Sequence, residues 1–289
     1  MSGVWRWLRA NAIVIYAGIA IFYLLVPLFV IGVFSFNDPA GKFNFTWEGF
    51  TLDHWENAFG IQELTDALVT SLELAAVSTV ISTILGTMIA LALVRHEFFG
   101  RRAANFLIVI PLATPEIVIG ASLLSLFLLT FGQTFLGFKS LLIAHVMFSI
   151  SFVVVVVRSR LIGFDRSLEE AARDLGADAL QTFRLVTLPL MMPGIVGAGM
   201  LAFALSIDDF VISNFNSGQT VTFPLYIFGA SQRGIPVEVY VIATILFAVT
   251  IGAMLFTIWQ QRRAERMAAA RPEQEVETPL ALAPGQGRA

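Results

Sequence analysis

The sequence contains no cysteine and has few charged residues. Without cysteine among its 289 residues, neither a disulfide nor thiol chemistry is available. Only 13% of the residues are charged and 57% are hydrophobic, with a mean hydropathy of +0.79, which excludes an ordinary soluble domain. The pattern GxxxxGK[ST] is also missing, so we do not expect this chain to hydrolyse ATP itself.

The apolar residues form long runs, which is typical of an integral membrane protein. Each run approaches or exceeds the ~20 residues that a spanning helix needs. We therefore predict an all-α membrane protein with six transmembrane helices, at 12–36, 67–94, 103–131, 140–157, 187–207 and 239–259. The predicted divisions are a first helix with an outer loop (1–66), a core transmembrane domain (67–260) and a disordered cytoplasmic tail (261–289).

Arginine placement predicts the orientation of these helices, because cytoplasmic loops are enriched in Lys and Arg. The loops assigned to the opposite side contain only Lys42, Lys139 and Arg233. Both termini are therefore expected in the cytoplasm, as an even number of spans requires. The residues on the cytoplasmic side are Arg6, Arg9, Arg95, Arg101, Arg102, Arg158, Arg160, Arg166, Arg173, Arg184, Arg262, Arg263 and Arg266.

The outer loop 37–66 is acidic. An acidic surface attracts cations, although an ordinary solvated loop would have the same composition. Trp47 and Trp55 lie in this loop, where anchoring at the membrane interface is the usual role of tryptophan. The acids are Asp38, Glu48, Asp53, Glu56, Glu63 and Asp66.

A polar amphipathic segment, SLEEAARDLGADALQTFRLVTLPLMMPGI at 167–195, separates two of the apolar runs. Ser167 and Glu170 have the spacing of a capping box at a helix start. Leu168 and Leu175 share a helical face with two alanines, and Gly176 is placed to end the helix. Such a helix could lie on the lipid surface or dock on a partner.

The residues of this segment resemble the EAA loop of ATP-binding-cassette importer permeases: Glu-Ala-Ala, three residues, glycine, nine residues, then Val-Thr-Leu-Pro. The resemblance implies a type I importer permease fold with a coupling helix near 167–180 that docks in a groove of a separate ATPase. It assigns Glu169, Glu170, Ala171, Ala172, Asp174 and Gly176 to this coupling.

Three acids lie near the predicted spans, where a charge costs about 2.5–3.5 kcal/mol on insertion scales. Glu116 follows Pro115 inside the third span, and Asp208 and Asp209 follow the fifth. They could form a site for a cationic ligand. Alternatively, Glu116 caps a helix broken by proline and the aspartates form a polar boundary. His145 is expected to be a hydrogen-bonded core residue.

LSIDDFVISNF, RLIGFDRSLEEAARDLGA and PEIVIGASLL together resemble the spermidine/putrescine permease family, in particular its second permease subunit, the C subunit. The likeness covers nearly the whole chain except the C-terminal tail. It implies a multi-pass subunit of the bacterial inner membrane that forms half of a polyamine pathway. It assigns substrate handling to Trp55, Glu116, Ser206, Asp208 and Asp209.

The resemblance also implies partners. These are a second permease chain, two ATPase subunits that use ATP and Mg, and an extracytoplasmic binding protein. The chain itself is expected to bind no cofactor, metal or nucleic acid and to be no enzyme. The alternatives are an importer of this family for another solute, such as an aminophosphonate or metal chelate, and a stand-alone ion-coupled carrier or channel.

Overall fold

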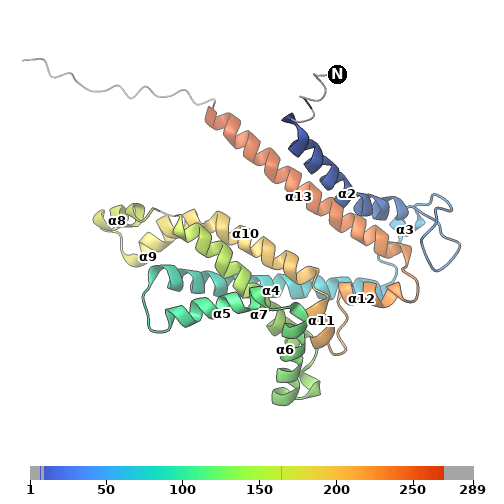
Figure 1. Ribbon diagram of the computed structural model, residues 1–289, viewed down its shortest axis with the longest axis horizontal. Helices are drawn as coiled ribbons and strands as arrows, with labels where there is room; N and C mark the ends of the chain where they lie inside the picture. The colour runs from blue at the N-terminus through green and yellow to red at the C-terminus, as the bar shows by residue number, and fades with distance from the viewer. Residues whose placement is uncertain (1–6, 8–9, 164, 270–289) are drawn as a thin grey trace, which may run out of the picture. The chain divides into compact units, whose positions relative to one another are not determined.

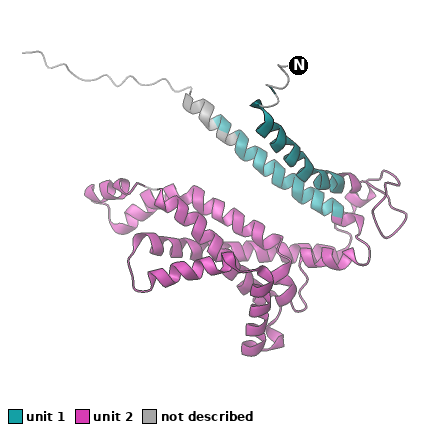
Figure 2. Ribbon diagram, in the orientation of Figure 1, with its two compact units in different colours: residues 1–32, 240–289 teal, residues 33–239 magenta. Residues whose placement is uncertain are grey.

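The computed structural model describes residue 7 and residues 10–163 and 165–269. It contains two compact units, residues 1–32 with 240–289 and residues 33–239 (Figure 2). Among the described residues the regular structure is helical, apart from an isolated bridge between Asn37 and Phe50. The expected all-α architecture is therefore confirmed.

The helices of residues 33–239 follow one another with short connections (Figure 1). The π-helical turn η2 runs directly into α10, so the segment from α9 to the end of α10 forms one apolar span, Ala179–Ile207. The elements are α3 (Asp53–Glu56), α4 (Gln62–Arg95), α5 (Arg101–Ala113), α6 (Glu116–Phe131), η1 (Gln133–Phe135), α7 (Phe138–Ile162), α8 (Ser167–Asp174), α9 (Ala179–Thr182), η2 (Phe183–Thr187), α10 (Leu188–Ile207), α11 (Val211–Asn216) and α12 (Phe223–Ser231).

The core of this unit lies where α4, α7 and α10 pack against one another. Small residues allow the helices to approach closely, as is common between membrane helices. A Cβ atom added at Gly86 of α4 would lie 2.5 Å from Val153 Cγ1 of α7. The buried residues of this core are Ala90, Leu93, Val153, Val154, Val157, Leu161, Met191, Ala198 and Ala202.

The third span, predicted at 103–131, is not a single straight helix, and it has the proline break that the sequence allowed. The chain breaks at Thr114–Pro115, and α5 and α6 are bent by 111° relative to each other. Proline disfavours the helical conformation of the residue before it, so Thr114 is extended, with φ −88° and ψ 134°.

The bent pair nevertheless connects opposite ends of α7. Near the start of α5, Asn105 Oδ1 accepts a hydrogen bond from Arg158 Nη1 at 2.6 Å, close to the end of α7. At the other end, α6 leads through η1 into the start of α7 at Phe138. Helix α7 has 25 residues and is therefore about 37 Å long, enough to cross a hydrocarbon core about 30 Å thick. Counted as one bent span, α5 and α6 complete six spans among the described helices.

The outer loop begins with a hydrogen-bonded asparagine. Asn37 is fully buried, and its amide donates to Asn44 Oδ1 and the Thr46 carbonyl at 2.6 and 2.7 Å. Helix α4 begins at Gln62, so Glu63 and Asp66 lie on its first turns and not in the loop as predicted.

The other unit contains α2 (Ala12–Phe34) up to residue 32 and α13 (Val237–Ala269) from residue 240. Ala12–Phe34 and Val237–Trp259 are long and apolar enough to cross a membrane, and the mean hydropathy of an 18-residue window in each is 2.6 and 2.5. Helix α13 continues through 261–269, part of the segment predicted to be disordered. The remainder of that segment, 270–289, lies outside the described residues.

Candidate functional site

The start of α8 differs from the predicted capping box. The N-cap is Arg166, which makes no side-chain capping bond, so the reciprocal Ser167–Glu170 pair does not form. Instead, the Ser167 N–H donates to Asp165 Oδ1 at 2.9 Å. This bond stabilises the ionised carboxylate and holds the pKa of Asp165 below its usual value. Asp165, and not Ser167, therefore supplies the side-chain acceptor at the start of α8.

The end of α8 is set by Gly176, as predicted. Its φ is +89°, in the left-handed region that favours glycine. The Gly176 N–H donates to the Arg173 carbonyl at 2.9 Å, and the Ala177 N–H donates to the Ala172 carbonyl at 3.1 Å. This pair of bonds is the Schellman motif. It ends the helix abruptly and turns the chain toward α9.

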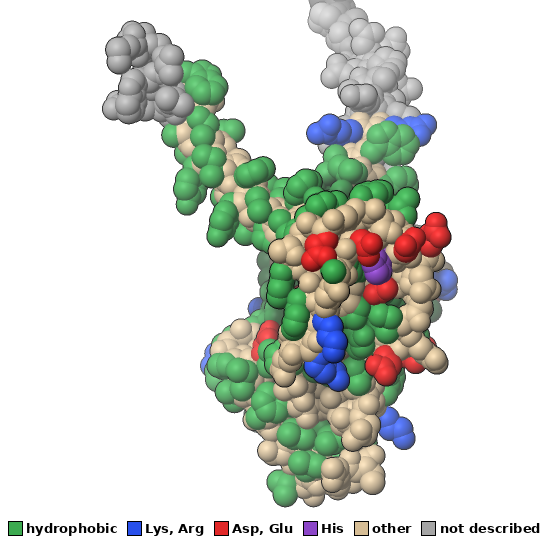
Figure 3. All heavy atoms as spheres, turned by 90° about the vertical axis from the view of Figure 1, so that its right-hand side faces the viewer, with side chains coloured by type: hydrophobic (Ala, Val, Ile, Leu, Met, Phe, Trp, Pro, Cys, Tyr) green, Lys and Arg blue, Asp and Glu red, His purple; other side chains and the backbone are tan. Residues whose placement is uncertain are grey.

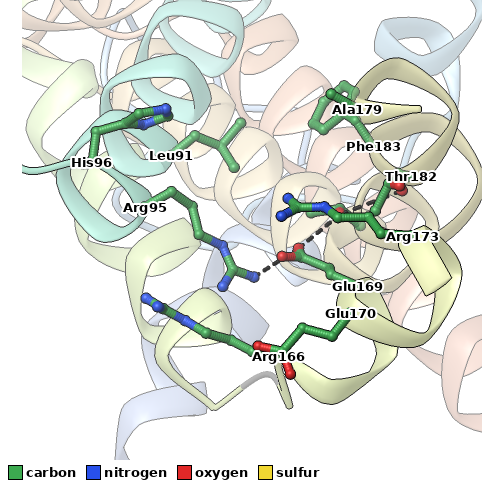
Figure 4. A pocket seen from close by; sticks show the side chains of 11 residues that line it. Leu91, Arg95, His96, Arg166, Glu169, Glu170, Arg173, Ala179, Thr182 and Phe183 are labelled. Atoms are coloured by element: carbon green, nitrogen blue, oxygen red, sulfur yellow. Dashed lines mark hydrogen bonds and ion pairs between the residues drawn. The ribbon is translucent and has the colours of Figure 1, made fainter. Parts of the chain in front are cut away.

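Glu169 joins α8 to two transmembrane elements (Figure 4). Its Oε1 accepts from Arg95 Nη2, at the end of α4, and from Thr187 Oγ1, at the end of η2, each at 2.8 Å. The Arg95 and Glu169 side chains are only 14% and 12% exposed. Arg95, Glu169 and Thr187 line a cavity of about 440 Å³. Arg166 and Arg173 line the same cavity. Glu169, one of the residues predicted to couple to an ATPase, thus bonds to residues of its own chain.

A second helix start follows α8. Asp178 Oδ1 accepts from the Gln181 N–H at 2.8 Å, and Gln181 Oε1 accepts from the Asp178 N–H at 3.0 Å. This is a reciprocal capping box, and it places η2 and α10 directly after α9. Asp-x-x-Gln before the apolar run was the available sequence signal, and it was missed.

Most of the other predicted coupling residues of α8 are exposed, and Glu170 also lines the cavity beside Glu169. Glu170, Ala171 and Asp174 are exposed, and Ala172 is half-buried. Leu168 and Leu175 are 48% and 90% exposed, so the apolar side of the helix is open within this chain. Glu169 faces inward and the leucines remain available to a partner.

A buried polar cluster lies near the other end of α10. Ser206 Oγ lies 2.7 Å from His145 Nδ1 and accepts from Ser78 Oγ at 3.0 Å. His145 Nε2 lies 3.1 Å from Ser213 Oγ. A ring protonated at Nε2 satisfies this arrangement, because Nδ1 can then accept from Ser206. His145 is therefore the hydrogen-bonded core residue expected, and the cluster ties α4, α7, α10 and α11 together.

Asp209 completes this cluster. Its carboxylate accepts from the backbone N–H groups of Ile212 and Ser213, at 3.2 and 2.7 Å, and so caps the start of α11. Asp209 Oδ2 also lies 3.5 Å from His145 Nε2, and the Asp209 side chain is 5% exposed. Sequence reasoning selected Asp209 and Ser206 but not their partners Ser78 and Ser213.

The other predicted substrate residues are placed differently. Glu116, the first residue of α6, and Asp208, the C-cap of α10, are both exposed. Helix α11 links α10 and α6. It follows α10 in the chain, and its Asn216 Nδ2 donates to the Gly120 carbonyl of α6 at 3.2 Å. Trp55 is separate from this group. It is half-buried in the outer loop, with its ring stacked on Phe36 at a centroid distance of 5.0 Å.

Acidic side chains gather on one face of the molecule (Figure 3). Of the loop acids, Asp38, Asp53 and Glu56 are exposed. Glu48 is exposed too, but its carboxylate supports the loop by accepting from the Ala40 N–H at 2.6 Å. Within residues 7, 10–163 and 165–269, no group of three or more His, Cys, Asp or Glu is arranged to hold a metal ion.

The sequence is similar to several characterised transport proteins. It is 36% identical over 236 residues to the spermidine/putrescine transport system permease protein PotC of Haemophilus influenzae, covering 81% of this chain and 90% of that protein. It is 38% identical to PotC of Escherichia coli K12, covering 79% and 86%. It is 36% identical to the putrescine transport system permease protein PotI of the same strain, covering 84% and 88%.

Solved structures share the fold. A chain of a bacterial ABC transporter involved in import of the acidic polysaccharide alginate superposes with a TM-score of 0.60 at 20% identity, covering 89% of this chain and 97% of that chain. A chain of the MetNI methionine ABC transporter in an inward-facing conformation gives 0.56 at 18% identity, covering 71% and 97%. Residues 82–268 match the family of binding-protein-dependent transport system inner membrane components. The chain therefore belongs to this family of membrane transport proteins.

Proposed function

We propose that this chain is a transmembrane permease subunit of an ATP-driven polyamine importer in a bacterial inner membrane. It would form half of the pathway beside a second permease chain, and an extracytoplasmic binding protein would deliver the substrate. Two separate ATPase subunits would use ATP and Mg. The observation that carries the importer assignment is helix α8, which is bonded to two transmembrane elements on one side and open on the other.

The exposed side of α8 suits a groove on an ATPase. Leu168 and Leu175 supply apolar contact, and Glu170 and Asp174 supply charge at its border. An amphipathic helix that places an apolar side in a groove is a recurrent mode of recognition. A stand-alone carrier has no need for such a helix at its cytoplasmic end.

Motion of α8 would reach the pathway through Glu169 and α10. When the ATPases close, α8 would carry Arg95 and Thr187 with it, because both bond to Glu169. Helix α10 follows Thr187 and has 20 residues, so it extends about 30 Å to Asp208. A rigid-body movement of α10 would therefore displace the polar cluster at its far end.

The cargo assignment rests on the relatives and on carboxylates. A polyamine is a chain of methylenes with several ammonium groups, which carboxylates pair with and aromatic faces attract. Glu116 and Asp208 are exposed and would contact ammonium groups directly. Asp209 and Ser206 would support them from behind, since both are held in the buried cluster. Trp55 would act earlier, near the outer loop.

Substrate-stimulated ATPase activity of the complete reconstituted complex tests this function. Spermidine and putrescine, presented with the binding protein, should stimulate hydrolysis, whereas anionic solutes should not. If only an anionic solute stimulated hydrolysis, the chain would belong to an importer of the same family that carries a solute other than a polyamine. Purification of the chain as a solitary species that transports without an ATPase would overturn the importer assignment.

A further inference from the structure

A second cavity, of about 260 Å³, lies at the predicted cytoplasmic ends of the core helices. Arg101 reaches it from the start of α5, Arg158 from the end of α7 and Arg166 from the N-cap of α8. The rest of its lining is apolar, formed by Leu93, Val94, Leu161 and Ile162. The cavity therefore combines three guanidinium groups with hydrocarbon walls at the predicted edge of the membrane.

Neutral acceptors hold the three arginines in place. Arg101 Nε donates to the Leu93 carbonyl at 2.9 Å, Arg158 Nη1 to Asn105 Oδ1 at 2.6 Å, and Arg166 Nη2 to the Val94 carbonyl at 3.4 Å. A guanidinium has five N–H donors, so each arginine keeps donors for a further acceptor. Bonds to neutral groups orient these side chains without neutralising their charge.

The chain supplies little negative charge to this cavity. Its lining contains no carboxylate, although Arg166 also lines the larger cavity, where Glu169 and Glu170 lie. Among the described residues, the one ion pair of these three arginines joins Arg101 Nη1 to Glu97 Oε1 at 3.9 Å, and the Glu97 side chain is 95% exposed. An exposed pair at that distance contributes at most about 1 kcal/mol. Three positive charges thus converge where an anion would compensate them.

We propose that this cavity binds the phosphate head group of an anionic phospholipid of the cytoplasmic leaflet. Guanidinium groups pair with phosphate oxygens by parallel N–H···O bonds. Basic pockets between transmembrane helices on the cytoplasmic side are suited to such head groups. The apolar wall at Leu161 and Ile162, the latter 66% exposed, gives the lipid's hydrocarbon a path out of the cavity and favours a lipid over a soluble phosphate. The bound lipid would bridge α5, α7 and the start of α8.

Native mass spectrometry of the full-length chain in detergent tests this proposal, with phosphatidylglycerol, phosphatidylcholine, inorganic phosphate and glycerol phosphate as probes. The wild type should retain phosphatidylglycerol in preference to phosphatidylcholine. Arg101→Gln and Arg158→Gln, on two different helices, should each weaken phosphatidylglycerol binding about fivefold, since an arginine near the membrane surface contributes about 1 kcal/mol. Arg102→Gln is the matched control, because Arg102 is exposed beside Arg101 and does not line the cavity.

Several results would overturn the assignment. Equal binding of the two lipids by the wild type would show that no anion site exists. An equal loss of phosphatidylglycerol binding in Arg102→Gln would show that the lipid responds to general surface charge and not to this cavity. Displacement of the lipid by inorganic phosphate or glycerol phosphate at equal concentration would identify a soluble anion. Loss of a co-purified ATPase from Arg158→Gln, with lipid binding unchanged, would assign the arginines to a protein partner.

Discussion

Glu169 and Arg95 form an ion pair with Oε1 and Nη2 2.8 Å apart, although 74 residues separate them in the sequence. Because Thr187 bonds to the same carboxylate oxygen, one side chain connects α8 with the ends of α4 and η2. The predicted docking element is thereby attached to the helices that it would have to move.

Glu169→Gln should uncouple ATP hydrolysis from uptake. The amide keeps the size of the side chain but loses the charge that pairs with Arg95, and charge-assisted hydrogen bonds contribute about 1.5–3 kcal/mol. In the reconstituted complex, we expect uptake to fall while hydrolysis continues. Glu97→Gln is the matched control, since the Glu97 side chain is 95% exposed on the same side of the protein. Normal uptake by Glu169→Gln would contradict the proposed attachment.

Gly176→Leu should also impair coupling, for a conformational reason. No atom lies within 4 Å of a Cβ placed there, so the cost is that of the left-handed backbone, about 1–2 kcal/mol. Gly176→Asn should be better tolerated, because asparagine adopts this conformation more readily. Gly163→Ala serves as control, with φ −79° at the neighbouring helix end. Uptake and apparent melting temperature report the effect, and equal behaviour of the Leu and Asn variants would refute the explanation.

Asp208→Asn should impair uptake, whereas Asp209→Asn should lower the stability of the protein. Asp208 is exposed, so its variant should weaken polyamine uptake without lowering the melting temperature. Asp209 accepts two backbone hydrogen bonds with a side chain 5% exposed, so its variant should destabilise the protein by about 1–3 kcal/mol. Uptake kinetics and thermal unfolding separate the two effects, and Asp53→Asn controls for exposed charge. An unchanged melting temperature in Asp209→Asn would argue against its structural role.

Gly86→Ala should destabilise the core, whereas Gly197→Ala should not. The added methyl group at Gly86 would lie 2.5 Å from Val153 Cγ1, and nothing lies within 4 Å at Gly197 of α10. Overpacking of this kind costs about 1–3 kcal/mol. Thermal unfolding in detergent measures the difference. Equal stability of the two variants would show that α4 and α7 are not in such close contact.

Single-cysteine labelling should confirm that α5 and α6 cross the membrane once. The absence of native cysteine makes each introduced thiol the only one in the chain. Gln133→Cys should react from the same side as Asp53→Cys, and Glu97→Cys from the same side as Ser167→Cys. All four positions are exposed. Labelling of Gln133→Cys and Glu97→Cys from one side would show a re-entrant pair in place of a span.

Several features could be predicted because they depend on local chemistry. Gly176 ends α8 because few other residues accept a positive φ, and this requirement is visible in a single position. The break at Pro115 had a local signal as well, and a helix broken by this proline was one of the two readings of Glu116. The 111° bend arises from how α5 packs near α7 while α6 packs on α11, which no local pattern encodes.

The sequence by itself determined that this is a helical membrane protein. The length of each apolar run and the placement of arginines beside it are properties of contiguous residues, so they can be read without the tertiary structure. It also located the segment that we propose couples to an ATPase, because that pattern lies in contiguous residues. Only the tertiary structure decided what the charged residues do. Glu169 and Glu170 are neighbours in the chain, yet one is bonded to Arg95 and the other is exposed. Asp208 and Asp209 divide in the same way, because burial and hydrogen bonding depend on helices that are distant in sequence.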